Sequence, residues 1–117
     1  MTKVIEDFFS AWAESDADKR ATMITSAVAE PVFYADPRTQ EPVTSMDGLL
    51  EYIGMFSKMA PGMPVAVTNV STTLTFARAT VQFGAGEQSQ HGQYTIDLNA
   101  DGKMTRIVGF VGMGEPS

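Results

Sequence analysis

Asp36 is the residue whose type and position most suggest chemistry, because it directly follows an apolar stretch and precedes Pro37. The stretch Val32–Ala35 is aromatic and β-branched, which predicts a strand. A carboxylate that a strand delivers to a protected site can accept a proton from a substrate. An aspartate before proline is also a common turn former, with its side chain bonded to nearby backbone amides. Both interpretations of Asp36 stay open on the sequence.

Metal and thiol chemistry finds little support in the remaining residues. The chain has no cysteine, which excludes disulfides, thiolate metal sites and a cysteine nucleophile. His91 is the only histidine, and strict alternation puts it on the strand face opposite Tyr94, which favours a solvent or interface position. The segment Asp97–Gly102 resembles the start of a calcium loop, but Val108 stands where the loop needs its bidentate acid. We therefore expect a plain hairpin there, with no metal and no cofactor.

Length, composition and charge limit the function classes. The chain has 117 residues, of which 44% are hydrophobic, as expected for one globular domain over residues 1–117. Its formal net charge of −6 disfavours binding to nucleic acid and to anionic membrane surfaces. No apolar run approaches the length of a membrane span, and the N-terminus does not look like a signal peptide. We expect a soluble, cytoplasmic protein.

Apolar residues at helical spacing predict three helices in the first half of the chain. The first two are separated by a cap at Ser15-Asp16, and Pro31 ends the second. A candidate capping box, Thr44-x-x-Asp47, predicts the start of the third helix, which ends at residues 60–62. The three apolar stripes are Ile5, Phe8, Phe9 and Trp12; Met23, Ile24, Ala27 and Val28; and Leu49, Tyr52, Ile53 and Phe56.

Strands dominate the second half. The Val- and Thr-rich segment 65–83 is too long for one strand, so we expect a turn near Thr73–Thr75. Residues 84–86 and 99–102 form further turns, and the strand between them buries Tyr94 with its alternate neighbours. The irregular apolar spacing of the last strand predicts a bulge. Helices followed by consecutive strands indicate an α+β fold with a mainly antiparallel sheet.

Five segments of the chain occur in an order that is typical of one superfamily. They are FFSAWAESD, FYADP, SMDGLLEYIGMF, APG and DLNADGKMTRIVGF. Together they make the chain resemble the nuclear transport factor 2-like superfamily, and most of all its ketosteroid isomerases and SnoaL-like polyketide cyclases. The resemblance covers nearly the whole chain. It implies a cone-shaped fold in which three N-terminal helices pack on a curved, mainly antiparallel sheet around an apolar cavity.

The resemblance also implies roles for individual residues. Asp36 matches the general-base aspartate of the isomerases. Tyr94 matches the position of their acidic proton donor and can donate through its hydroxyl, whereas Phe8 matches their tyrosine donor and cannot donate. Asp36 and Tyr94 are therefore the candidate catalytic residues. The candidate ligand-binding residues, which the core and the cavity of this fold would share, are Phe8, Trp12, Tyr34, Tyr52, Phe56, Val81, Phe83 and Phe110.

Two hypotheses follow from different classes of protein. In the first, Asp36 moves a proton on an apolar carbonyl or polyketide-like compound while Tyr94 polarises the oxygen. In the second, the protein is a non-catalytic binding module whose cavity holds an apolar molecule or is filled by its own side chains. Both predict a small apolar molecule as partner. Both also predict a homodimer, because a sheet face of Val, Thr and Tyr would otherwise be uncovered.

Overall fold

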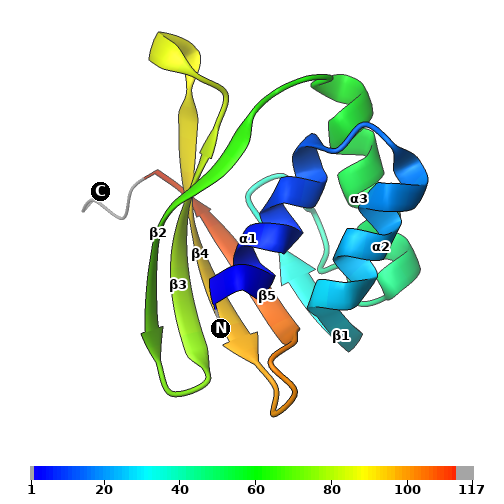
Figure 1. Ribbon diagram of the computed structural model, residues 1–117, viewed down its shortest axis with the longest axis vertical. Coiled ribbons are helices and arrows are strands. Elements are labelled where there is room, and N and C mark those ends of the chain that lie inside the picture. Colours follow the sequence, from blue (N-terminus) through cyan, green and yellow to red (C-terminus); the bar gives the residue numbers. More distant parts are fainter. Residues whose placement is uncertain (1, 113–117) are drawn as a thin grey trace.

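A computed structural model of the protein describes residues 2–112 and shows three helices gathered on one face of a five-stranded sheet (Figure 1). The helices precede most of the strands, as the sequence pattern predicts. The helical elements are α1 (Thr2–Ser10), the short 3₁₀ helix η1 (Ala11–Ala13), α2 (Ala17–Ala27), α3 (Met46–Met59) and the 3₁₀ helix η2 (Gly86–Gln88). The strands are β1 (Val28–Ala35), β2 (Val65–Thr73), β3 (Phe76–Phe83), β4 (Gln90–Leu98) and β5 (Met104–Val111).

The sheet is open and mixed, with strand order β1-β5-β4-β3-β2. Strands β2 to β5 pair antiparallel, and β1 pairs parallel with β5. The prediction of an α+β fold with a mainly antiparallel sheet is therefore confirmed. Because β1 and β4 both flank β5, their side chains on the inner face come close together at the end where β1 finishes. No helix within residues 2–112 is long and apolar enough to cross a membrane.

The helix starts follow the capping signals with one correction. Asp16 caps α2, since its carboxylate accepts from the amides of Asp18 at 3.0 Å and Lys19 at 3.1 Å, as predicted. The predicted cap of α3 at Thr44 is wrong. Ser45 is the N-cap, and its hydroxyl accepts from the Gly48 amide at 3.0 Å. Either hydroxyl residue could cap a helix here, and the backbone path into α3 selects the second one.

Strand β1 begins at Val28, four residues earlier than the sequence pattern suggested, and it contains Pro31. A proline is tolerated because β1 is an edge strand, where a missing amide breaks no second ladder. The pairing with β5 shifts register between Val28 and Phe33. Val28 is buried, so the residue expected at the end of the α2 stripe belongs to the strand while still packing in the core.

The turns between strands match the predictions. Leu74 and Thr75 connect β2 to β3, and Leu74 takes a positive φ of 54° without a glycine to mark the turn. Asn99 closes the hairpin between β4 and β5, because its side-chain oxygen accepts from the Asp101 and Lys103 amides, both at 3.0 Å. The predicted bulge is present where the β4–β5 register shifts between Asp97 and Leu98. The hairpin interpretation of the calcium-like segment is thus confirmed.

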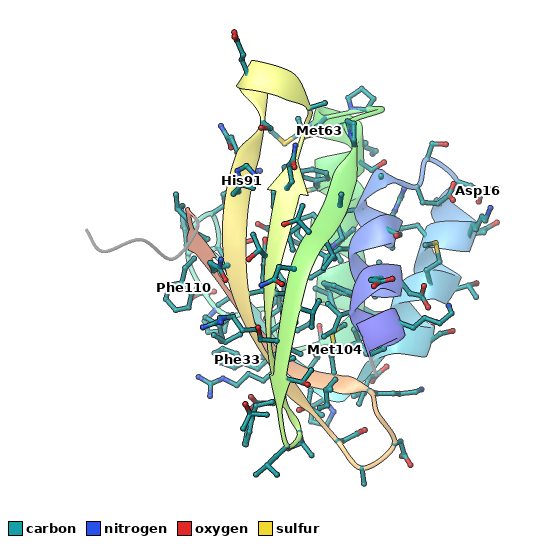
Figure 2. All side chains as sticks on the ribbon, turned by 60° about the vertical axis from the view of Figure 1, so that its left-hand side comes forward. Asp16, Phe33, Met63, His91, Met104 and Phe110 are labelled. Carbon is teal, nitrogen blue, oxygen red and sulfur yellow. The ribbon has the colours of Figure 1, made fainter. Side chains whose placement is uncertain are left out.

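The two faces of the sheet differ in content. The inner face packs on the helices and buries Tyr94, together with the aromatic residues of α1. On the outer face, away from the helices, Phe33 and Phe110 are exposed at 36% and 55%, and Figure 2 shows both there. The Arg106 guanidinium lies 5.5 Å from the centre of the Phe33 ring. The expected uncovered face of Val, Thr and Tyr is wrong in one respect, since Tyr94 points inward.

Candidate functional site

The Asp36 carboxylate lies at the end of β1 and accepts hydrogen bonds from four groups. Its Oδ2 accepts from the Tyr34 hydroxyl at 2.6 Å. The Tyr52 hydroxyl on α3 lies between the two oxygens, 2.8 Å from Oδ1 and 2.7 Å from Oδ2. The backbone amides of Arg38 and Thr39 donate to Oδ1 at 2.9 and 3.2 Å. Asp36 is therefore a turn former, as one interpretation of the sequence proposed, and it also binds two tyrosines.

The local chain path explains why the carboxylate stays in this position. Tyr34 and Val43 exchange two backbone hydrogen bonds, at 2.9 and 2.8 Å, which close the loop that follows β1. Inside this loop, the Thr39 hydroxyl accepts from the Asp36 amide at 3.1 Å and donates to the Asp36 carbonyl at 2.9 Å. An ionised carboxylate offers about four acceptor sites. Because four donors already occupy the Asp36 carboxylate, it can accept a proton only if one of these hydrogen bonds breaks.

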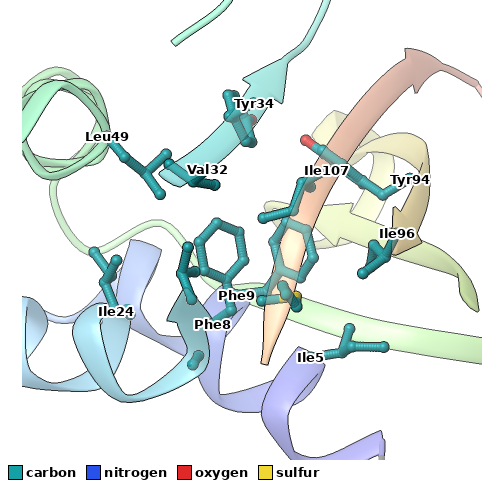
Figure 3. Packing of buried hydrophobic residues seen from close by; sticks show 14 of the residues in the cluster. Ile5, Phe8, Phe9, Ile24, Val32, Tyr34, Leu49, Tyr94, Ile96 and Ile107 are labelled. Carbon is teal, nitrogen blue, oxygen red and sulfur yellow. The ribbon is translucent and has the colours of Figure 1, made fainter. Parts of the chain in front are cut away.

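Tyr94 on β4 is held in a slot made by two glycines. A Cβ placed on Gly109 of β5 would lie 2.5 Å from Cε2 of the Tyr94 ring, and one on Gly92 would lie 3.2 Å from its Cε1. Phe9 of α1 packs on the ring from the helix side, with centroids 4.7 Å apart. Figure 3 shows Tyr94 lying across the inner face with its hydroxyl end directed toward Tyr34. The orientation of Tyr94 therefore depends on the absence of side chains at two neighbouring positions.

All three tyrosines of the chain belong to this group, and each has a raised pKa. Burial is the main cause for Tyr34, whose pKa lies well above its usual range, and the charges of Tyr94 and Asp36 add to it. Burial also raises the pKa of Tyr52, followed by its hydrogen bond to Asp36. For Tyr94, burial and then the charge of Asp36 raise the pKa. The three hydroxyls therefore stay protonated near neutral pH and act as donors.

A hollow of about 500 Å³ opens beside this group, and we call it the Asp36 hollow. Its wall combines several aromatic side chains with the Asp36 carboxylate and the Tyr94 hydroxyl, and polar residues line much of the rest. Such a wall suits an apolar molecule with one or two polar atoms. The sequence-predicted residues that line it are Trp12, Asp36, Phe56, Phe83, Tyr94 and Phe110.

Four predicted ligand-binding residues have other positions. Phe8 and Val81 are fully buried core residues outside the hollow's lining. Tyr34 is also fully buried and reaches the site only through its hydrogen bond to Asp36. Tyr52 lines a second hollow, to which Phe56 also contributes.

The second hollow has a volume of about 680 Å³, and we call it the methionine hollow. Met55, Met59 and Met63 line it, and the first two are exposed at 53% and 80%. It shares part of its lining with the Asp36 hollow, so the two lie next to each other. The shared residues, which we call the junction, are Arg38, Phe56, Phe83 and Gln90.

Sequence reasoning missed the polar residues at the mouth of the Asp36 hollow. His91 lines it from the start of β4, beside Gln90, and Arg38 lines it from the loop after β1. Figure 2 shows His91 at the same end of the molecule as Met63. The position of Arg38 two residues after Asp36 was the one available signal. In the part of the chain that the structure describes, no three acidic or histidine side chains gather as a metal site would need.

Trp12 lies deepest in the aromatic wall. Its ring is 3% exposed and packs against Phe56 and Phe83, with ring centroids 5.1 and 5.9 Å away. Its indole Nε1 is buried and has no hydrogen-bond partner within residues 2–112. The indole is therefore held by ring packing alone.

Comparison with solved structures identifies proteins that share this fold. No family model and no curated protein matches the chain. Among solved structures, a candidate isomerase of the SnoaL-like family from Agrobacterium tumefaciens superposes with a TM-score of 0.83 at 22% identity, over 95% of this chain and 96% of that one. A SnoaL-like protein of unknown function from Burkholderia thailandensis gives a TM-score of 0.73 at 11% identity, over 92% and 90% of the two chains.

A third structure of this kind carries a ligand. It is a hypothetical protein with a ketosteroid isomerase-like fold from Catenulispora acidiphila, in complex with trimethylamine, with a TM-score of 0.75 at 10% identity over 95% of this chain and 86% of that one. The resemblance found in the sequence is thus confirmed at the level of the fold. The chain has the fold of the nuclear transport factor 2-like superfamily.

Proposed function

We propose that this protein binds a small apolar molecule with a carbonyl group in the Asp36 hollow. One observation carries the proposal: a hollow of about 500 Å³ with an aromatic wall has the Asp36 carboxylate and the Tyr94 hydroxyl in the same lining. The aromatic rings exclude water from an apolar ligand, and the Tyr94 hydroxyl, which stays protonated, can donate to its oxygen. The fold shared with a candidate isomerase of the SnoaL-like family supports this assignment by analogy alone.

The reaction that this arrangement suits is proton transfer next to the carbonyl. Asp36 removes a proton from the adjacent carbon, and the electrons of the broken C–H bond form an enolate whose oxygen accepts from Tyr94. The proton on Asp36 then returns to the same carbon or to a conjugated one. The Tyr52 hydroxyl, which bridges both carboxylate oxygens and is half-buried, is the donor most easily exchanged when Asp36 takes the proton.

Hydrogen–deuterium exchange on a simple ketone tests this chemistry without knowledge of the natural substrate. We expect the protein to accelerate exchange of the α-protons of β-tetralone in heavy water, measured by proton NMR. Asp36→Asn keeps the shape and should reduce the acceleration by about a hundredfold or more. Tyr94→Phe should cost about a hundredfold, as loss of one oxyanion donor does. Asp47→Asn, an exposed acid on α3, is the matched control and should leave exchange unchanged.

The alternative is a binding module without catalysis. Two observations favour it: four donors already occupy Asp36, and Phe8 has no hydroxyl at the position of the isomerases' second donor. In that case β-tetralone should bind without accelerated exchange. The trimethylamine bound by the Catenulispora acidiphila protein makes a small amine the competing ligand class, because aromatic rings beside a carboxylate also attract ammonium groups.

We also propose that the outer sheet face pairs with a second copy of the chain around a two-fold axis. The exposed rings of Phe33 and Phe110 support this, since they add apolar area to a face that also carries Arg78 and Arg106. Sedimentation at micromolar concentration should give a dimer, and Phe110→Asp should shift it to monomer. A monomeric wild-type protein would contradict the pairing.

A further inference from the structure

Arg38 is the charged side chain that the two hollows share. It lines both the Asp36 hollow and the methionine hollow, and among the residues that line the methionine hollow it alone carries a charge. Arg38 is exposed on the loop after β1. Because Arg38 lines both hollows, a molecule that extends from one hollow into the other would lie beside it.

Among residues 2–112, no side chain or backbone group forms an ion pair or hydrogen bond with the Arg38 guanidinium. The ion pairs found within residues 2–112 join Lys3 to Asp7 at 2.8 Å and Lys19 to Glu14 at 3.7 Å. Its backbone amide donates to Asp36, but its side chain makes no hydrogen bond in the described part of the chain. Its positive charge nevertheless acts on the site, because it partly lowers the raised pKa of the Tyr52 and Tyr94 hydroxyls. An arginine fork that is unpaired in a chain of net charge −6 is available to an external anion.

The methionine hollow adds an apolar extension to this cation. Met55, Met59 and Met63 are unbranched and polarizable, so they adapt to apolar chains of different shape. Ala60 caps the C-terminal end of α3, where helix carbonyls repel an anion. An amphipathic anion would therefore lie with its charged group at Arg38 and its apolar tail toward the end of α3.

We propose that the ligand of this protein is an amphipathic anion with one carboxylate-like group, which Arg38 binds at the junction while the apolar tail occupies the methionine hollow. The inference rests on the proposed function in that the rest of the ligand enters the Asp36 hollow. It goes beyond that function because it assigns a charge, a length and a direction to the molecule. Charge complementarity carries it, since the methionine hollow presents one cation and no acid in its lining.

Methyl NMR on protein with carbon-labelled methionine methyl groups tests the proposal, with octanoate, octanol and octyltrimethylammonium as probes. Octanoate should shift the methyl signals of Met55, Met59 and Met63. The signals of Met23 and Met104, which line neither hollow, should stay in place. Octanoate should bind more tightly than octyltrimethylammonium.

Variants at Arg38 distinguish the contribution of the ligand's charge to its affinity from that of its apolar tail. Arg38→Gln should weaken octanoate about two- to fivefold, the range for an exposed ion pair, and leave octanol unchanged. Arg38→Lys should keep part of the affinity. Arg78→Gln removes the same charge from the outer face of β3 and is the matched control, with no change expected for either probe.

Several results would overturn the proposal. They are tighter binding of octyltrimethylammonium than of octanoate, equal loss of octanoate and octanol in Arg38→Gln, and methionine signals that none of the probes moves. The readout is independent of catalysis. If octanoate shifts the methionine signals but β-tetralone shows no exchange, the proton-transfer proposal is wrong and the anion site stands. If β-tetralone exchanges but octanoate shifts no methionine signal, only the anion site is wrong.

Discussion

The two ends of the aromatic layer between helices and sheet are built from similar rings but do different things. At one end, Phe8 and Phe9 of α1 are fully buried, pack edge to face with centroids 4.9 Å apart, and line neither the Asp36 hollow nor the methionine hollow. At the other end, Tyr34, Tyr52 and Tyr94 carry hydroxyls, and those of Tyr34 and Tyr52 donate to the Asp36 carboxylate. Tyr94 and Tyr52 each line a hollow there. The phenylalanine end thus stabilises the fold, whereas the hydroxyl groups of the tyrosine end can form hydrogen bonds to a carboxylate or a ligand.

The largest effect should come from the closed end. Phe8→Ala removes a fully buried ring and should lower the free energy of unfolding by about 3–5 kcal/mol. Phe110→Ala deletes the same atoms from a half-exposed position and should lower the free energy of unfolding by less than about 1.5 kcal/mol. Urea denaturation followed by circular dichroism measures both. Equal losses would mean that burial at the closed end adds no stability beyond that of a ring on the outer face of the sheet.

Alkaline pH should act on the open end next. The folded pKa values of the tyrosines are raised, so above pH ~10 the unfolded chain loses protons that the folded chain keeps, and stability falls as pH rises. With Tyr34 and Tyr94 both buried, the loss should be about 2 kcal/mol over the first pH unit above ~10. Tyr94→Phe removes one titrating group and should make the decline shallower. Denaturation midpoints between neutral and alkaline pH test this, and a flat profile would contradict it.

The glycine slot should give an intermediate effect. Gly109→Ala puts a methyl group against the Tyr94 ring and should cost about 1–3 kcal/mol while displacing the hydroxyl from the hollow. Gly54→Ala on α3 is the matched control, because its added Cβ would meet Arg20 at an ordinary 3.7 Å. A helical glycine replaced by alanine should gain up to about 1 kcal/mol. Thermal unfolding distinguishes the two, and unchanged stability in Gly109→Ala would show that the ring can move freely.

The smallest effects should separate the two tyrosines bound to Asp36. Tyr34→Phe leaves a buried acceptor without its 2.6 Å donor and should cost about 2 kcal/mol. Tyr52→Phe should cost about 1 kcal/mol or less, because Tyr52 is half-buried and water can replace its hydroxyl. Chemical denaturation of the two variants gives the comparison. The reverse order would mean that Tyr52, rather than Tyr34, fixes the carboxylate.

Local patterns in the sequence were sufficient for most of the fold. The stripe of α1 and the cap at Asp16 depend on neighbours within a few residues, so periodicity and side-chain type predict them. The start of β1 could not be read in this way, because Val28 pairs with Met104 from the far end of the chain. The choice of Ser45 over Thr44 likewise depends on where the loop closes against β1.

Individual residues of the site could be predicted from the sequence, but their arrangement in space could not. Asp36 and Tyr94 were selected through the family resemblance, and both line the same hollow. Tyr52 binds Asp36 from sixteen positions away only because α3 packs beside the end of β1, and no sequence signal encodes that approach. The junction at Arg38 is formed by residues that become neighbours through the tertiary fold alone.

Trp12 has an optical consequence. It is the only tryptophan of the chain, its indole is shielded from water, and its ring forms part of the Asp36 hollow between Phe56 and Phe83. Its fluorescence should therefore be emitted at short wavelength and should respond when a molecule enters the hollow. The protein carries a built-in reporter, so mixtures of unlabelled compounds can be screened for its ligand by emission intensity alone.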